Sequence, residues 1–330
     1  MTADVLQVQN LKGFYKGSFG TVYAVDGVSL TIKSGEILGL VGESGCGKST
    51  LAKLILGTKV PYLYRAEGKV FIEGHDIYNM SPEKLRKHVL CKFVSWVPQS
   101  SLNSLNPTLR LKNFVAEMLR ERTGKKYNPE EVKKMLAEYF RALGLDEHVL
   151  DLYPHELSGG MRQRAIIAIS SFVKPSLYIL DEPTSALDVF SQKLLIKMLF
   201  EIYQRGMIKS ALYISHDIST LRQICNNIAV MYAGKLVEYG GTENLVKDPL
   251  HPYTKALIFS SLPLEQWIKH ERDKFREIKG RPPDLRNPPP GCRFHTRCPN
   301  AISGLCDSEE PPFINVRGRF ISCWLYKEGA

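Results

Sequence analysis

The glycine-rich stretch GESGCGKST, residues 42–50, constrains the fold of this chain more than any other segment. Its spacing, G-x4-G-K-S, is that of a P-loop. The apolar segment GEILGLVG runs into the loop as a short strand, and KSTLAKLILG follows it with the leucine spacing of a helix. A strand, a glycine loop and a helix in this order predict a phosphate-binding site in an α/β fold.

The residue types of this loop suit a nucleotide. Glycines let backbone N–H groups turn toward phosphate oxygens, and the following helix adds its positive dipole end, which contributes about 0.3–1 kcal/mol. That is too little to hold a triphosphate, so we expect Lys48 to supply a full charge and Ser49 to ligate Mg²⁺. The loop residues expected to contact the nucleotide are Gly42, Ser44, Gly45, Cys46, Gly47, Lys48, Ser49 and Thr50.

An acidic pair farther along the chain supports a nucleotide site. In LYILDEP, Asp181 ends an apolar run and Glu182 follows it. An aspartate at the end of a buried strand can hold Mg²⁺, and the adjacent glutamate can polarise the attacking water. The cation and Lys48 would offset the repulsion between the two carboxylates, so both can stay ionised.

Composition limits the class of protein. The chain has 330 residues, of which 44% are hydrophobic and 24% charged, as in ordinary globular proteins. We find no apolar run near the roughly 20 residues that span a bilayer, and no signal peptide at MTADVLQVQN. We therefore expect a cytosolic protein. The net charge of +10 suits phosphate ligands, an anionic membrane face or nucleic acid, and does not choose among them.

Strand-like and helix-like segments alternate along the chain, which predicts a doubly wound α/β core with insertions. We expect strands in 91–99, 176–188 and 210–217, and charged amphipathic helices over 109–152. NIAVMYAGKLVEYG reads as a hairpin that turns at Ala233-Gly234. A proline-rich stretch at 280–292 favours extended backbone and indicates a linker.

The cysteines concentrate near the end of the sequence. Four of seven lie in the last 39 residues, with the spacing C-x5-C-x7-C-x16-C: Cys292, Cys298, Cys306 and Cys323. Four thiolates can hold Zn²⁺ or a [4Fe–4S] cluster. The spacing matches neither a C-x2-C zinc ribbon nor the bacterial ferredoxin run, so metal ligands and free or paired thiols both remain open.

At ELSGGMRQRAIIA, residues 156–168, the chain resembles the ATP-binding-cassette (ABC) ATPases, whose signature is LSGGQ. Other landmarks of that family follow in order. Gln99 in WVPQ matches the Q-loop, residues 185–188 match the D-loop, and His216 in YISHD matches the switch histidine. The resemblance covers about residues 5–262. It implies a RecA-like P-loop NTPase core with an antiparallel β-subdomain and an α-helical subdomain insert.

The resemblance also implies roles for residues. Glu182 would activate water, His216 would contact the γ-phosphate, and Gln99 would sense Mg²⁺. In this family two cassettes pack head to tail, so that the signature segment of one, here Ser158, Gly159 and Gly160, closes on the γ-phosphate bound by the other. For the adenine ring the family's aromatic aligns with Phe19, with Tyr23 as second choice.

Finer features resemble the ATPase subunits of dipeptide and oligopeptide importers, and nickel importers of the same group remain an alternative. The features are SLNPTLR after the Q-loop, HPYTKAL at 251–257 and GCRFHTRCPNA at 291–301. This resemblance implies two membrane permease subunits, an extracytoplasmic peptide-binding protein and a peripheral position on the cytoplasmic face of the membrane. Met161 replaces the signature glutamine, as in one of two paralogous subunits, so we expect a heterodimer with a second ATPase.

The resemblance completes the expected domain plan. We expect an ATPase domain at 1–262 with a helical subdomain near 100–157, a proline-rich linker at 263–291 and a cysteine-rich extension at 292–330. In the family this extension is associated with an iron–sulfur cluster, so we favour [4Fe–4S] over Zn²⁺ on the four cysteines. Two other functions are kept as alternatives: a soluble ABC ATPase that acts on nucleic acid, although we expect no such partner, and a module that binds ATP without turnover.

Overall fold

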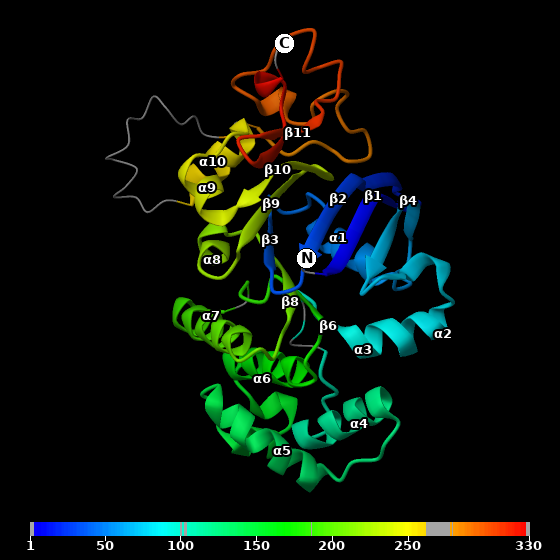
Figure 1. The fold of residues 1–330 in the computed structure, drawn as a ribbon, viewed down its shortest axis with the longest axis vertical. Helices are drawn as coiled ribbons and strands as arrows, with labels where there is room; N and C mark the ends of the chain where they lie inside the picture. Colours follow the sequence, from blue (N-terminus) through cyan, green and yellow to red (C-terminus); the bar gives the residue numbers. More distant parts are fainter. Residues whose placement is uncertain are drawn as a thin grey trace. The chain divides into compact units, whose positions relative to one another are not determined.

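The computed structural model describes residues 3–99, 101, 104–185, 187–261, 278 and 280–327 (Figure 1). These residues form two compact units. Unit 1 covers 1–6, 32–35 and 71–212, and unit 2 covers 7–31, 36–70 and 213–330, each as far as its residues are described.

A buried parallel strand pair carries the P-loop in unit 2. β3 (Ile37–Val41) pairs in parallel with β9 (Asn227–Tyr232), which pairs antiparallel with β10 (Lys235–Gly241). All five residues of β3 are buried, because an unbroken apolar run forms a strand covered on both faces. The chain then turns through the glycine loop into α1 (Lys48–Leu56), which ends at Gly57 in the left-handed conformation.

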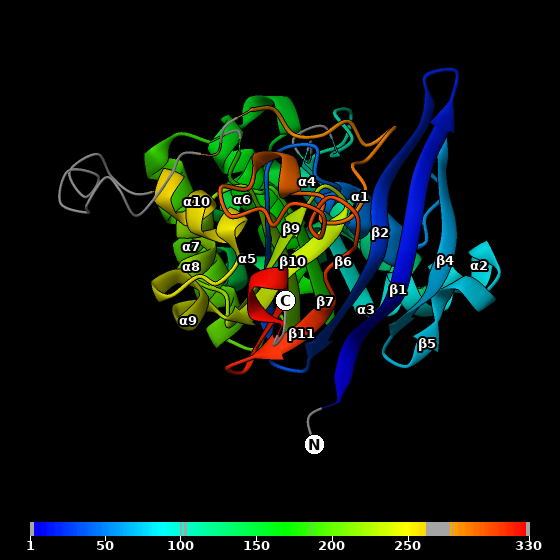
Figure 2. The same ribbon diagram turned by 90° about the horizontal axis from the view of Figure 1, so that it is seen from above.

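A second sheet in unit 2 contains long strands. Its order is β2-β1-β4-β5, where β5 is the short strand His75–Asp76, and Figure 2 shows β2, β1 and β4 side by side. The bounds are β1 (Asp4–Gly17), β2 (Gly20–Lys33) and β4 (Leu63–Ile72), and the division between the units crosses each of them. This unit also contains short helices: α8 (Ile218–Arg222), α9 (Thr242–Lys247) and α10 (Pro252–Ser260).

Unit 1 combines two parallel strands with helices. β6 (Val94–Val97) pairs in parallel with β7 (Leu177–Asp181), and α6 (Gly159–Phe172) packs against β6 (Figure 1). The remaining elements include β5 (His75–Asp76), α2 (Pro82–Lys84), α3 (Cys91–Phe93), α4 (Leu111–Thr123), α5 (Pro129–Ala142) and α7 (Val189–Gln204). β8 (Ser210–Ser215) begins in unit 1 and ends in unit 2.

Local sequence explains these helices. Asn128 caps α5 by accepting a hydrogen bond from the Glu130 amide, and Pro129 occupies the first helical position. Val132, Leu136 and Phe140 then bury one stripe at four-residue spacing, as the amphipathic pattern predicts.

The strand expected at 91–99 is shorter than its apolar pattern suggests. Cys91–Phe93 is helical, because it continues a π-helical turn at Leu85–Leu90, and only Val94–Val97 is extended.

The cysteine-bearing end of the chain is part of unit 2. Its hairpin, β11 (Phe313–Val316) and β12 (Arg319–Ser322), continues the β3-β9-β10 sheet, since β12 pairs antiparallel with β10 (Figures 1 and 2). Ile321 and Cys323 pack with Leu250 in a small buried cluster. Within the part of the chain that the structure describes, we find no helix long and apolar enough to cross a membrane.

Candidate functional site

Close backbone contacts fix the shape of the glycine loop. Gly47 has φ of 108°, and a Cβ atom there would lie 2.0 Å from the Ala24 carbonyl oxygen. A Cβ atom on Gly42 would lie 2.1 Å from the Met231 carbonyl oxygen. Only glycine fits at either position, because backbone atoms cannot move aside as a flexible side chain would. Ser44 and Gly45 form the exposed tip between them.

The start of α1 has the features of an anion site. Its N-cap, Gly47, supplies no side-chain hydrogen bond, and the first turn contains no acidic residue. The first backbone N–H groups of a helix without a side-chain cap can bind phosphate oxygens, helped by the helix dipole. These features fit a nucleotide phosphate.

Lys48 lies over the loop that precedes it. Its side chain is buried, and Nζ donates to the carbonyl oxygens of Gly42 at 2.7 Å and Glu43 at 3.0 Å. Nζ also lies 3.8 Å from Cys46 Sγ. Burial raises the pKa of the Cys46 thiol, against the opposing charge of Lys48. The Cys46 thiol is therefore neutral at pH 7.

The aromatic residue that contacts α1 is Tyr15, and not Phe19 or Tyr23, which the sequence suggested for the adenine ring. Phe19 is exposed in the turn before β2, and its ring approaches that of Tyr62. Tyr23 is exposed on β2, and its ring approaches that of Phe14. Tyr15, at the end of β1, has its hydroxyl 3.5 Å from Thr50 Oγ1 in the first turn of α1. Tyr15 was not among the residues that the sequence suggested, although it is an aromatic residue in the same stretch before the P-loop.

His216 follows β8 in unit 2 and is exposed. The next residue, Asp217, caps α8 by accepting from the Ser219 amide at 2.8 Å and from Thr220 Oγ1 at 2.7 Å. The histidine is therefore held between a strand end and a capped helix.

The acidic pair lies at the end of β7 in unit 1. Asp181 and Glu182 are 2% and 8% exposed. Glu182 has φ of 52°, a left-handed conformation that costs a non-glycine residue roughly 1–3 kcal/mol. Ser185 offsets part of this strain, because its amide and hydroxyl both donate to the Glu182 carbonyl oxygen, at 3.3 and 3.0 Å. Strain of this kind is common where a side chain must be aimed at a ligand.

The signature segment begins α6 in unit 1. Ser158 is the N-cap, and its hydroxyl accepts from the Met161 amide at 3.3 Å. Ser158 and Gly159 are exposed, whereas Gly160 is half-buried beside α7, where a Cβ atom would lie 3.0 Å from Ser191 Oγ. The helix start is therefore accessible to a second molecule.

The Q-loop and D-loop residues flank this segment in sequence and belong to the same unit. Gln99 is exposed two residues after β6. Ser101 Oγ donates to Gln163 Oε1 of α6 at 2.8 Å, and both side chains are buried. Asp188 caps α7 by accepting from the Ser191 amide at 3.0 Å. Ala186 of the D-loop lies outside the described residues.

The expected site residues are thus distributed over both units. Unit 2 brings the P-loop, Lys48, Ser49 and Tyr15 together. The other expected site residues in unit 2 are Phe19 and His216. The expected site residues in unit 1 are Gln99, Ser158, Gly159, Gly160, Asp181 and Glu182.

The expectation of a metal cluster in the cysteine-rich end is wrong. The described residues contain no group of three or more His, Cys, Asp or Glu that could hold a metal ion. Burial, and then the neighbouring thiols, raise the pKa of Cys292 to about 11 and of Cys323 to about 12. Burial also raises the pKa of Cys298. Protonated thiols do not bind metal well, and this part of the chain is held by the β12–β10 pairing. Cys306 is the fourth cysteine of this set. Because the described residues contain no such metal-binding group, neither the [4Fe–4S] nor the Zn²⁺ interpretation stands.

Comparisons with known proteins match both halves of the sequence. A family model described as ABC transporter matches residues 25–185, and one described as Oligopeptide/dipeptide transporter, C-terminal region, matches 237–306. The chain is 39% identical to the "Dipeptide transport ATP-binding protein DppD" of Caldanaerobacter subterraneus over 98% of both proteins. It is 41% identical to the "Oligopeptide transport ATP-binding protein AppF" of Bacillus subtilis, over 95% of this chain and 93% of the relative.

The solved structures agree on the fold. The ATP-binding cassette MJ0796, a dimer bound to ADP and Pi, matches with a TM-score of 0.63 and 26% identity. The match covers 72% of this chain and 98% of that one.

Proposed function

This chain belongs to the ABC transporter ATP-binding proteins, and from this premise we propose that it powers a peptide importer as one of its nucleotide-binding subunits. The chain is an ATPase of this family, with the cassette fold. The observation that carries the peptide assignment is the match of residues 237–306 to the oligopeptide/dipeptide C-terminal region, because a P-loop alone occurs in many classes of NTPase. This match favours peptides over the nickel and nucleic-acid alternatives.

The residue roles follow from the chemistry of each position. Lys48 and the N–H groups that begin α1 bind the phosphates. Ser49 and Asp181 would hold Mg²⁺, which neutralises phosphate charge when bound, and Gln99 would sense it. Glu182 polarises the attacking water, supported by its buried position and its strained backbone.

The remaining contacts to nucleotide are also part of the proposal. His216 would contact the γ-phosphate. We keep Phe19 as the sequence-based candidate for the adenine ring and add Tyr15, which the contact with Thr50 supports.

The proposed partner for ATP-driven closure is a second, non-identical ATPase subunit. The exposed start of α6, with Ser158 as its N-cap, supports a role as a second anion site for the nucleotide of that partner. The similar cassette MJ0796 forms a dimer. Met161, in place of the signature glutamine, supports a heterodimer over a homodimer.

A groove in unit 1 supports a membrane partner. A cavity of about 500 Å³ is lined by Val94 and Ser95 of β6 and by Phe114 and Met118 of α4. A protein segment seated there would touch the strand that ends two residues before Gln99. We assign this groove to a permease subunit, which would place the chain at the cytoplasmic face of a membrane, with an extracytoplasmic peptide-binding protein acting through the permease.

The domain plan stays a proposal: ATPase at 1–262, linker at 263–291 and extension at 292–330. Much of that linker, 263–277 and 279, lies outside the described residues.

The function is tested by turnover and by transport. The purified chain should hydrolyse ATP only with Mg²⁺, and the K48A variant should lose this activity. Coexpressed with the permease pair, the partner ATPase and the binding protein, it should drive uptake of a labelled dipeptide. An M118D variant should keep ATP hydrolysis and fail to copurify with the permeases. Turnover by K48A, or uptake that does not depend on this chain, would contradict the proposal.

A further inference from the structure

The C-terminal part of the chain contacts the P-loop through an ion pair. Arg297, in the short 3-10 turn His295–Arg297, makes a two-point contact with Glu43, which follows Gly42 in the loop. Its two terminal nitrogens lie 2.8 and 3.1 Å from the two carboxylate oxygens. The arginine side chain is 6% exposed and the glutamate 25%. A fork-to-fork pair of this kind fixes geometry as well as charge.

Further contacts hold both members of this pair. The Glu43 amide donates to the Tyr253 hydroxyl at 2.8 Å, and the Tyr253 ring packs against Tyr232 with centroids 4.6 Å apart. Arg297 also donates to the Tyr232 hydroxyl at 3.2 Å and to the Gly280 carbonyl oxygen at 3.2 Å. Glu43 is therefore fixed at its backbone by α10 and at its side chain by the C-terminal part of the chain.

A second arginine supports the other end of the loop tip. Arg293 donates to the Ala233 carbonyl oxygen and, at 2.5 Å, to Asp26 of β2. The adjacent Gly234 donates its amide to the Cys46 carbonyl oxygen at 2.8 Å. Arg293 thus braces the hairpin turn on which the P-loop rests.

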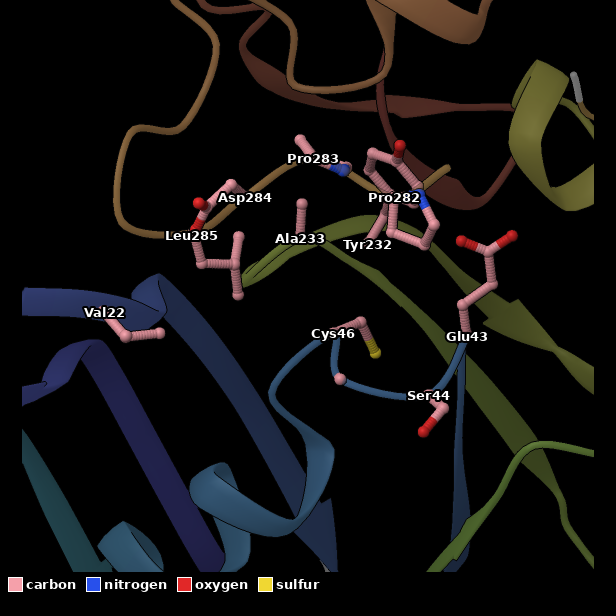
Figure 3. Close-up of a pocket in the computed structure, with 11 residues that line it drawn as sticks. Val22, Glu43, Ser44, Cys46, Tyr232, Ala233, Pro282, Pro283, Asp284 and Leu285 are labelled. Atoms are coloured by element: carbon pink, nitrogen blue, oxygen red, sulfur yellow. The ribbon is translucent and has the colours of Figure 1, made fainter. Parts of the chain in front are cut away.

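The segment before these arginines lies over the same loop. A cavity of about 270 Å³ separates Ser44, Gly45 and Cys46 from the segment at 282–285 (Figure 3). The Leu285 carbonyl oxygen accepts from the Tyr23 amide at 2.9 Å, which ties this segment to β2. Figure 3 shows Pro282 and Pro283 across the cavity from Cys46.

We propose that Arg297 is a positioning residue for nucleotide binding, through which the C-terminal part of the chain holds the P-loop in its phosphate-binding shape. The inference rests on the proposed function of that loop. Glu43 adds a carboxylate to the phosphate-binding loop itself, and such a charge repels an anion unless it is paired. Arg297 supplies the pairing charge and the rigid geometry, so the loop needs less reordering when ATP binds.

The test compares ATP affinity and turnover in full-length variants. R297A should raise the KM for ATP about tenfold, the equivalent of roughly 1.4 kcal/mol, with kcat changed much less. R297K keeps the positive charge but cannot make the two-point contact with Glu43. Its KM for ATP should lie between those of R297A and the wild type. The double variant E43Q/R297A should bind ATP more tightly than R297A, because it also removes the carboxylate left unpaired.

Arg319 is the matched control. It is 4% exposed in β12 of the same C-terminal part and pairs with Asp248 and Glu238, neither of which belongs to the P-loop. R319A should lower thermal stability and leave the KM for ATP unchanged. A KM in R319A raised as much as in R297A would overturn the inference, because general loosening would then explain both.

Two more results decide the question. If R297A folds and has the wild-type KM for ATP, the inference is overturned. If R297A does not fold, a wild-type KM for ATP in R297K overturns the inference. Failure of the proposed function is separate: the wild-type chain would then fail to bind ATP, or K48A would bind it as well as the wild type does.

Discussion

The hydroxyl of Ser101 and the side-chain oxygen of Gln163 are joined by a buried hydrogen bond of 2.8 Å. Ser101 lies in the loop that contains Gln99, and Gln163 lies in the second turn of α6, whose first residues carry the signature. The bond therefore links the loop proposed to sense Mg²⁺ to the helix proposed to meet the partner's nucleotide.

The S101A variant should weaken this link. Removal of the hydroxyl leaves the buried side-chain oxygen of Gln163 without this hydrogen bond, which should lower the free energy of unfolding by about 1–3 kcal/mol. We expect a lower urea midpoint, near-normal basal ATP hydrolysis and reduced stimulation by the permeases. The control is S104A, because Ser104 is exposed and its hydroxyl donates to the Ser101 carbonyl oxygen. Equal stimulation in S101A and S104A would argue against coupling through Gln163.

Replacement of Glu182 by glutamine should separate binding from turnover. The amide keeps the size of the side chain and loses the charge that polarises water, so kcat should fall by about 10²- to 10⁴-fold while ATP still binds. With ATP and the partner subunit present, gel filtration should show a trapped dimer. E138Q is the control, because Glu138 is exposed on α5. Undiminished hydrolysis by E182Q would remove Glu182 from its role.

The sequence predicted the local elements around the phosphate loop well. β3, α1 and the turn at Ala233-Gly234 all form where the apolar runs and glycines place them. These features depend on neighbours in the chain, and each has a strong local signal. The family relationship, which rests on motif spacing, was likewise available from the sequence and is confirmed.

The C-terminal part of the chain was harder to predict, because its structure depends on partners distant in sequence. Arg297 lies 254 positions from Glu43, and Arg293 lies 267 from Asp26. Nothing in the local pattern of cysteines and prolines indicates these pairs or the addition of β12 to β10. The same cysteine pattern suggested a metal, because spacing alone does not show that burial raises the pKa of Cys292 and Cys323.

Asp151 should make unit 1 less stable in acid. Lys112 and Lys133 lie 2.8 and 2.5 Å from its oxygens and lower its pKa to about 2. Because this pKa is below the unfolded value, the stabilisation is present above about pH 4 and is lost as the pH falls toward 2. D151N should cost about 1 kcal/mol at pH 7, since the group is partly solvated, and almost nothing at pH 2. Urea unfolding at both pH values measures this.

The control for Asp151 is an exposed pair in the same unit. Glu147 lies 3.4 Å from Arg141, and both side chains are largely exposed. E147Q should change stability by less than about 0.5 kcal/mol at either pH. A D151N effect that does not shrink in acid would show that packing, and not the charge pair, explains the loss.

His251 should dominate a separate pH dependence in unit 2. It is 1% exposed, and burial, then the charge of Lys255, lower its pKa to about 3. The neutral ring accepts from the Tyr253 amide at 3.0 Å and caps α10. Because the unfolded chain binds a proton near pH 6.5 and the folded one does not, stability is full above pH 6.5 and declines as the pH falls toward 3.

The H251N variant tests this directly, since asparagine is also a good N-cap and does not titrate. We expect a flatter dependence of unfolding free energy on pH between about 6.5 and 4, where the wild type should lose about 1.4 kcal/mol for each pH unit well below 6.5. H155N is the control, because His155 is exposed in the turn before the signature. A slope in H251N as steep as in the wild type would assign the acid sensitivity to other groups.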